Sequence, residues 1–170
     1  NENTRPAMGN HIFGTFGHDF LCADGERVMI VGVSPNQWQA IVKVTDCANV
    51  VAALASELDL NFDKEGDRFA ARERLRSLFA PWFAARSSKQ VHAALEAAGV
   101  CWGPYQTIKQ LVGNDGECSI ENPLFSSIDQ PEIGRLLTPS QPLNFAGIES
   151  TEPKPAPRLG QHTDEILSEI

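Results

Sequence analysis

The chain has 170 residues, of which 42% are hydrophobic and 21% charged, the balance of an ordinary globular protein. Its net charge of −8 argues against nucleic acid or an anionic membrane as a partner, because both require clustered Lys and Arg. No apolar run approaches the roughly 20 residues of a transmembrane helix and no signal peptide is visible, so we expect a soluble, cytoplasmic protein.

The four cysteines are Cys22, Cys47, Cys101 and Cys118. They form no C-x-x-C pair of the kind that holds structural zinc. A disulfide framework is usually denser and belongs to smaller secreted chains. We therefore expect reduced, structural thiols and no metal site, in agreement with a reducing cytoplasm.

Residues 1–19 are interpreted as a linker that carries glycines. The chain begins with Asn rather than Met and its opening lacks hydrophobic periodicity, so we interpret it as a piece of a longer protein. Gly9, Gly14 and Gly17 do not form G-x-G-x-x-G before a helix, which disfavours a phosphate-binding loop. Either these glycines let the backbone approach a ligand closely, or they form a turn-rich lead-in to the first strand.

A turn, a strand and a capped helix are predicted next. Asp24 and Gly25 are typical of a tight hairpin turn. Residues 28–33 form a continuous apolar, β-branched run that predicts a strand buried on both faces. Ser34 and Pro35 then suit the N-cap and the first position of a helix.

Helices with short strands between them are expected up to Gly113, which makes 20–113 a small α/β domain. The predicted elements are helices over 35–42, 48–58, 67–86 and 89–98, a strand over 100–102 and a short helix from Thr107. The helix over 67–86 contains Pro81, which predicts a kink. Its arginines alternate with acidic residues, so a solvated face is favoured over an anion site; they are Arg68, Arg72, Arg74 and Arg76.

Residues 114–170 are predicted to form an extended arm that ends in a helix. The segment holds most of the prolines, which favour extended, edge-like pieces such as 124–125, 136–137 and 143–145. Thr163 is the expected N-cap of a final helix with an apolar face. Such an arm suits docking on a second body of protein, outside this sequence.

No catalytic residue is predicted within the chain. The histidines, His11, His18, His92 and His162, belong to no H-E-x-x-H or Ser/His/Asp set, and no Walker loop or paired-carboxylate helix is present. His18 and Asp19 are adjacent, and because neighbouring strand residues point to opposite faces, a catalytic dyad there is disfavoured. Residue types alone therefore name no reaction.

Three runs carry a resemblance: ADGERVMIVGVSPNQWQAIV, AALEAAGVCWGPYQTIKQLV and PRLGQHTDEILSEI. Their order and spacing resemble the C-terminal half of the class III CoA-transferase family, which includes the carnitine-dehydratase and bile-acid-inducible group. The resemblance covers nearly all of 20–170. The last run is the most specific, although Gln161 replaces the usual Glu.

The resemblance implies a small α/β domain inserted into a larger domain that lies outside this chain, with the C-terminal arm returning to that larger domain. It also implies an interlocked homodimer. The substrates are a CoA thioester and a small carboxylic acid, and no cofactor is permanently bound. The nucleophilic Asp, which forms the acyl-enzyme, belongs to the missing N-terminal half. Gly14 and Gly17 correspond to a glycine loop over the acyl-CoA site.

The phrases FGTFGHDF and CWGPYQT resemble the branch of this family that moves CoA between two carboxyl groups of one diacid, by intramolecular C1–C4 transfer on mesaconyl-CoA. His18 stands where that branch is expected to have Arg. An α-methylacyl-CoA racemase is an alternative, which Ser34 disfavours because it stands where racemase members carry Glu. A stand-alone, non-catalytic interaction module is the other alternative.

Overall fold

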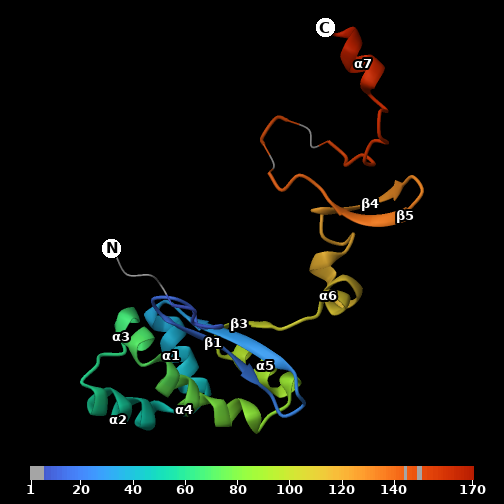
Figure 1. The fold of residues 1–170 in the computed structure, drawn as a ribbon. Helices are drawn as coiled ribbons and strands as arrows, with labels where there is room; N and C mark the ends of the chain where they lie inside the picture. Colours follow the sequence, from blue (N-terminus) through green and yellow to red (C-terminus); the bar gives the residue numbers. More distant parts are fainter. Residues whose placement is uncertain (1–5, 144, 149–150) are drawn as a thin grey trace. The chain divides into compact units, whose positions relative to one another are not determined.

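The computed structural model describes residues 6–143, 145–148 and 151–170, so Asn144 of the expected piece 143–145 lies outside the described residues. The chain divides into two compact units, residues 1–105 and residues 106–170, which are treated separately (Figure 1). The boundary therefore follows Tyr105, whereas the sequence placed it after Gly113. Each unit has its own sheet.

The first unit contains a three-stranded antiparallel sheet with β2 in the middle. Its strands are β1 (Phe16–Leu21), β2 (Arg27–Gly32) and β3 (Cys101–Pro104). Gly25 adopts a φ of +85° in the turn between β1 and β2, as the Asp-Gly pair predicted. Since β1 begins at Phe16, regular structure starts inside the segment that was expected to be a linker.

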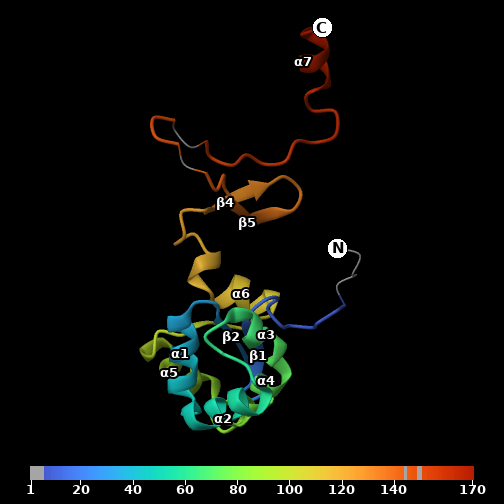
Figure 2. The same ribbon diagram turned by 90° about the vertical axis from the view of Figure 1, so that its left-hand side faces the viewer.

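Five helices lie on one side of this sheet (Figure 1 and Figure 2). They are α1 (Pro35–Val44), α2 (Ala48–Leu58), α3 (Glu65–Ala70), α4 (Arg72–Ala84) and α5 (Ser88–Ala97). Ser34 and Ser87 both form capping boxes, in which the hydroxyl accepts from the backbone N–H three residues on. The predicted start of α1 at Pro35 is confirmed, whereas α5 starts at Ser88, one residue before its predicted start.

The expectation that the second strand is buried on both faces is wrong. Val28 and Ile30 are fully enclosed, whereas Met29 and Val31 are only half-buried. The reason is that the helices of this chain cover one face of the sheet. Buried and less buried residues alternate along β2, and the buried ones lie on the face that the helices cover.

The prediction of a single helix over 67–86 is also wrong. Ala71, with φ −91° and ψ 8°, interrupts the helix and separates α3 from α4. Pro81 does not end α4, which continues to Ala84. The apolar face of α4 lies on the core, where Leu75, Phe79 and Phe83 are fully buried.

Aromatic rings fill the space between the sheet and the helices. Phe16 packs edge-on against Trp38 and Phe79, with ring centroids 5.6 and 5.4 Å away. Phe20 stacks on Phe83 at 4.3 Å. These contacts join β1 to both α1 and α4, so the sheet and the helices share one core.

Arg68 lies inside this core, which corrects the prediction of a solvated arginine face. Its side chain is fully buried, and its guanidinium donates to the carbonyl oxygens of Phe62 and Val33, both at 2.7 Å. The same group lies over the Trp38 ring at 5.5 Å from the centroid. A planar guanidinium with several donors can satisfy two separate loops at once, and here it ties the end of β2 to the connector before α3.

The second unit consists of short elements. They are α6 (Ile108–Asn114), a 3₁₀ turn at Gly116–Cys118, β4 (Phe125–Gln130), β5 (Gly134–Pro139) and α7 (Thr163–Ser168). The strands pair as an antiparallel hairpin, with Phe125 opposite Pro139. The N-cap of α7 is His162 rather than the expected Thr163.

The Pro-rich segment after the hairpin is attached to it by polar contacts. The Gln130 side chain accepts from the Ala156 N–H at 2.8 Å and donates to the Ala156 carbonyl at 3.2 Å. Arg158 pairs with Glu132 at 3.2 Å. No described residue between 106 and 170 is buried, however, and apolar side chains such as Ile108, Ile133 and Ile170 stand largely exposed.

Replacing Arg68 by Met is expected to lower the free energy of unfolding of the first unit by about 3 kcal/mol, because two buried carbonyl groups lose their donor. Urea denaturation followed by tryptophan fluorescence measures this, since Trp38, Trp82 and Trp102 all lie in that unit. Arg76→Met is the matched control, because that side chain is 48% exposed, and its effect should stay within about 0.5 kcal/mol. Equal effects of the two substitutions would contradict the role given to Arg68.

Candidate functional site

The segment of residues 8–15 contains Gly14, one of the two glycines predicted to form the loop over the acyl-CoA site. Within the first unit, this segment packs against β1 and the end of β2. Ile12 donates its N–H to the carbonyl of Gly17 at 3.0 Å, and the Thr15 hydroxyl donates to the carbonyl of Gly32 at 2.9 Å. Gly14 forms the turn between these contacts with a φ of +83°, a conformation that favours glycine. A Cβ at Gly14 would have open space around it, so this position can admit a neighbouring group.

Gly17 has a different local role, because it lies within β1 opposite Val31. A Cβ at this position would come within 2.5 Å of Ile12 Cγ1 and 3.2 Å of the Ile30 carbonyl oxygen. The absence of a side chain therefore makes room for Ile12 of the same chain. The two predicted glycines are brought into one short stretch, and their role in an acyl-CoA loop stays a prediction.

A buried carboxylate lies beside this segment. Asp19 is 4% exposed; Asn10 donates to its Oδ1 at 2.9 Å, and Arg27 forms an ion pair with its Oδ2. Burial alone would raise the pKa of Asp19, but the hydrogen bond from Asn10 and the charge of Arg27 outweigh it and hold that pKa below its ordinary value. Asp19 is therefore a fixed anion at neutral pH.

His18 and Asp19 do meet, although their adjacency in a strand argued against it. His18 Nδ1 lies 3.2 Å from Asp19 Oδ1 and 2.6 Å from the Asp19 carbonyl oxygen. The ring of His11 stands edge-on to that of His18, with centroids 4.2 Å apart, and His11 Nε2 lies 2.9 Å from Glu73 Oε1. Sequence analysis missed this cluster of titratable groups because Glu73 is 62 residues away from His11.

The cluster has the geometry of a structural anchor rather than of an open catalytic site. The side chains of His18 and Asp19 are only 11% and 3% exposed, and the oxygens of Asp19 are already engaged by Asn10 and Arg27. A carboxylate held in this way is a poor nucleophile, because its lone pairs and its charge are neutralised by fixed partners. The cluster can position the segment of residues 8–15.

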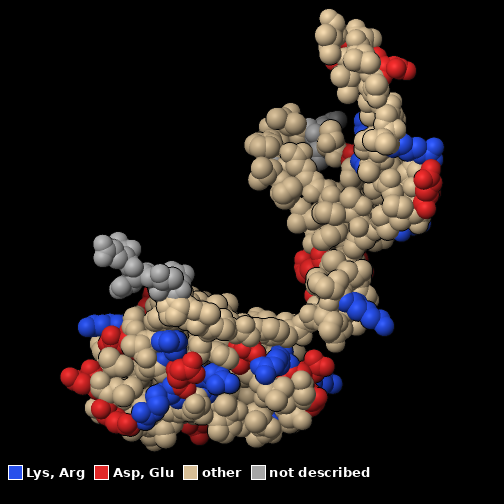
Figure 3. Space-filling model, in the orientation of Figure 1, with Lys and Arg blue, Asp and Glu red and all other residues tan. Residues whose placement is uncertain are grey.

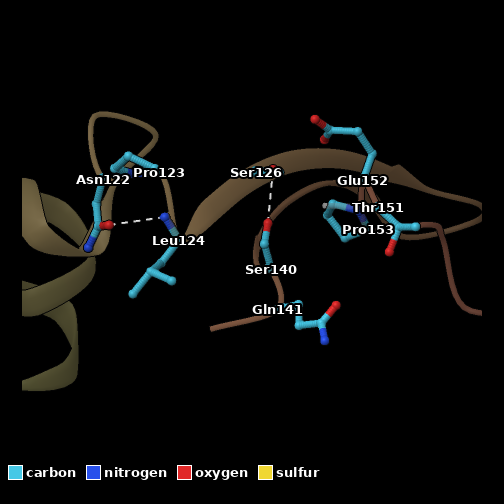
Figure 4. Close-up of a pocket in the computed structure, with 9 residues that line it drawn as sticks. All are labelled: Asn122, Pro123, Leu124, Ser126, Ser140, Gln141, Thr151, Glu152 and Pro153. Atoms are coloured by element: carbon cyan, nitrogen blue, oxygen red, sulfur yellow. Dashed lines mark hydrogen bonds between the residues drawn. The ribbon is translucent and has the colours of Figure 1, made fainter. Parts of the chain in front are cut away.

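A hollow of about 410 Å³ lies within the second unit (Figure 4). Its lining residues are Asn122, Pro123, Leu124, Ser126, Ser140, Gln141, Thr151, Glu152 and Pro153. The hydroxyls of Ser126 and Ser140 form a hydrogen bond of 3.2 Å in its lining. These residues include one carboxylate and no cation, so the hollow does not suit the phosphates of a CoA ester.

Charge on the first unit is mixed. On the face that Figure 3 shows, Lys and Arg are interspersed with Asp and Glu. Within the described residues, no cluster of three or more His, Cys, Asp or Glu is arranged to hold a metal ion. Over the same residues, no helix combines the length and the apolar character that crossing a membrane requires.

Comparison with known proteins shows the family. The model of CoA-transferase family III matches residues 1–163. The chain belongs to CoA-transferase family III. This confirms the resemblance that was based on the three sequence runs.

Two curated relatives show how much of the family protein is present. The chain is 45% identical over all 170 residues to 2-methylfumaryl-CoA isomerase from Chloroflexus aurantiacus, of which it covers 42%. It is 25% identical over 152 residues to succinyl-CoA:glutarate CoA-transferase from Mus musculus, covering 89% of this chain and 33% of that protein. The chain thus spans less than half the length of each.

Solved structures support the fold. The chain is similar to Rv3272 from Mycobacterium tuberculosis with a TM-score of 0.64 at 20% identity, over 86% of this chain and 38% of that one. It is also similar to a CAIB/BAIF family protein from Brucella suis with a TM-score of 0.58 at 19% identity, over 98% of this chain and 41% of that one. The expected fold class, a small α/β domain followed by an arm, is confirmed.

Replacing Gly17 by Ala should destabilise the first unit by about 1–3 kcal/mol, because the new methyl group would displace Ile12 from β1. Gly103→Ala is the matched control, since Gly103 lies in β3 opposite Met29 with open space at its Cβ, and its effect should stay within about 0.5 kcal/mol. Urea midpoints followed by tryptophan fluorescence measure both. A Gly17→Ala protein as stable as Gly103→Ala would contradict the packing of Ile12 described above.

Proposed function

We propose that this chain is the C-terminal part of an enzyme that moves CoA between carboxyl groups, and that its reaction is the intramolecular C1–C4 transfer of CoA on mesaconyl-CoA. The observation that carries the proposal is the 45% identity to 2-methylfumaryl-CoA isomerase along the whole chain. Mesaconic acid is 2-methylfumaric acid, so the acyl group in that relative's name is the one proposed here. The wider family membership supports CoA thioesters and small carboxylic acids as substrates.

A carboxylate nucleophile outside this chain suits such a reaction. The carboxylate attacks the thioester carbonyl, CoA leaves as a thiolate, and a mixed anhydride remains. The thiolate then attacks the enzyme's carbonyl, which releases the diacid and leaves an enzyme thioester. The second carboxylate of the same diacid attacks that thioester, which forms a new mixed anhydride and expels the CoA thiolate. The thiolate then attacks the diacid carbonyl of this anhydride, which gives the C4 thioester and frees the enzyme carboxylate. One thioester is consumed and one is formed, so no ATP is required.

The described residues favour a role for this chain in shaping the acyl-CoA site rather than in supplying its nucleophile. Asp19 is enclosed by Asn10 and Arg27, so it is not offered as the nucleophile. Gly14 and Gly17 are proposed as the glycine loop over the acyl-CoA site, and the open space at Gly14 favours its part in that loop. The 170-residue chain alone is then inactive.

The second unit supports a further part of the proposal. Its exposed apolar side chains favour docking of the arm on the rest of the protein, in an interlocked homodimer. The protein is proposed to act in the cytoplasm and to bind no permanent cofactor.

The racemase alternative is disfavoured by the structure of α1. The Ser34 hydroxyl accepts from the N–H of Gln37 at 3.2 Å, while the Gln37 side chain accepts from the N–H of Ser34 at 3.0 Å. This capping box occupies the hydroxyl at the position where racemase members carry Glu. A stand-alone interaction module is the second alternative, and the exposed apolar surface of the arm favours it if the full-length protein proves inactive.

The test is an assay of the full-length protein with mesaconyl-C1-CoA and added ¹³C-labelled mesaconate, with the two regioisomers separated by chromatography and mass spectrometry. We expect the C4 ester to form without label, because CoA stays with one diacid. Labelled ester would show intermolecular transfer and would contradict the intramolecular reaction. The α-carbon of mesaconyl-C1-CoA carries no hydrogen, so the racemase alternative is tested with a saturated 2-methylacyl-CoA in D₂O; deuterium uptake at its α-carbon would show a racemase and contradict the proposal. Absence of any turnover of CoA esters would contradict the enzyme proposal.

A further inference from the structure

His11 is held in one protonation state by its surroundings. Its side chain is 5% exposed, and its Nε2 lies 2.9 Å from a carboxylate oxygen of Glu73. A carboxylate accepts hydrogen bonds, so Nε2 carries the ring proton and Nδ1 is left as a bare acceptor. The neutral ring fits this arrangement.

A second proton on His11 would have no partner. Nδ1 is fully enclosed, and no described residue forms a hydrogen bond with it. Protonation would place an N–H there without an acceptor and a charge in a dry site, and both changes cost free energy. The neighbouring ring of His18, at 4.2 Å, offers an edge rather than a carboxylate.

The charged groups around His11 come from three elements. Glu73 and Arg72 face it from α4, His18 and Asp19 lie on β1, and Arg27 on β2 pairs with Asp19. Glu73 is 64% exposed, so water weakens its attraction for a charged ring. Burial, with help from His18 and Arg72, therefore outweighs Glu73 and lowers the pKa of His11 below 6.5.

His11 is part of the segment that the other contacts attach to β1 and β2. Asn10 on one side of it binds Asp19, and Ile12 on the other side binds the Gly17 carbonyl. The hydrogen bond from His11 to Glu73 connects this segment to α4, and Phe13 packs edge-on against Phe69 of α3 with ring centroids 5.1 Å apart. The His11 side chain thus helps to hold residues 8–15 against the strands and α4 of the first unit.

We propose that His11 is a proton-sensitive latch, which holds residues 8–15 on the first unit while its ring is neutral and releases them when Nδ1 is protonated. A histidine whose folded-state pKa is lowered favours folding above its ordinary pKa of about 6.5, and that contribution is lost as the pH falls below this value. Asp19, whose pKa is held below 3.8, keeps its charge throughout this range and does not contribute to the change. The segment should open in mild acid while the core stays folded.

The test is hydrogen exchange of the full-length protein at pH 7.5 and 5.5, read at the Ile12 amide and corrected for the intrinsic pH dependence of exchange. We expect its protection to fall below about pH 6.5, by at most about tenfold per pH unit, as one proton allows. Protection at the core amide of Ile30 should stay unchanged. Unchanged protection of Ile12 would overturn the proposal.

Two substitutions identify the titrating group. His11→Gln keeps a donor for Glu73 and cannot titrate in this range, so Ile12 protection should become independent of pH. His92→Gln, at a half-buried histidine on α5 whose Nε2 is also enclosed without a hydrogen-bond partner among the described residues, is the matched control and should keep the dependence. If His11→Gln keeps the dependence and His18→Gln abolishes it, the latch is not His11.

Glu73→Gln separates titration from a merely structural contact, and remains informative if His11→Gln fails to fold. The amide oxygen still accepts from Nε2, but the negative charge that favours the protonated ring is removed. The pKa of His11 in the closed segment should fall further, so the loss of Ile12 protection should begin at the same pH, set by the open segment, and become larger in mild acid. A loss of protection smaller than in the unaltered protein would overturn the proposal.

Discussion

Among the described residues, burial of apolar side chains stops at Val100, and the rest of the structure depends on that limit. Before it, the sheet and five helices enclose a core of aromatic and aliphatic residues tied together by Arg68. After it, no described residue is buried. A two-stranded hairpin and helices of six or seven residues are marginal in water by themselves, so the second unit needs a surface to cover it.

The comparisons agree with that constraint. The chain covers 42% of a relative to which it is 45% identical throughout, and about the same share of the solved structures that it resembles. A first unit with its own core and a second unit with none is the expected division when a small domain and an arm are taken from a larger enzyme. The proposed chemistry fits this division, because the described residues provide a well-packed scaffold with two glycines at its edge, and the buried carboxylate of Asp19 is already engaged by Asn10 and Arg27.

Local signals in the sequence were sufficient for much of this structure. The Ser34 and Ser87 capping boxes, the Asp24-Gly25 turn and the apolar stripe of α4 follow from interactions within a few residues. The burial of Arg68 was not predicted, because its positive charge was given more weight than its position in the helical pattern. Arg68 precedes Ala71 by three residues and Leu75 by seven, which is the period of the buried stripe, so the helical pattern itself could have placed it in the core. The hydrogen bond between His11 and Glu73 could not have been found in this way, because only the tertiary fold brings those residues together.

The central claim is that the second unit takes its order from polypeptide outside this chain. Hydrogen exchange of residues 106–170 tests it most directly, measured once in the isolated 170-residue chain and once in the full-length protein. The account predicts exchange close to that of an unfolded peptide in the isolated chain, except where it self-associates, and strong protection of β4, β5 and α7 in the full-length protein. Slow exchange of these elements in a monomeric sample of the isolated chain would contradict it.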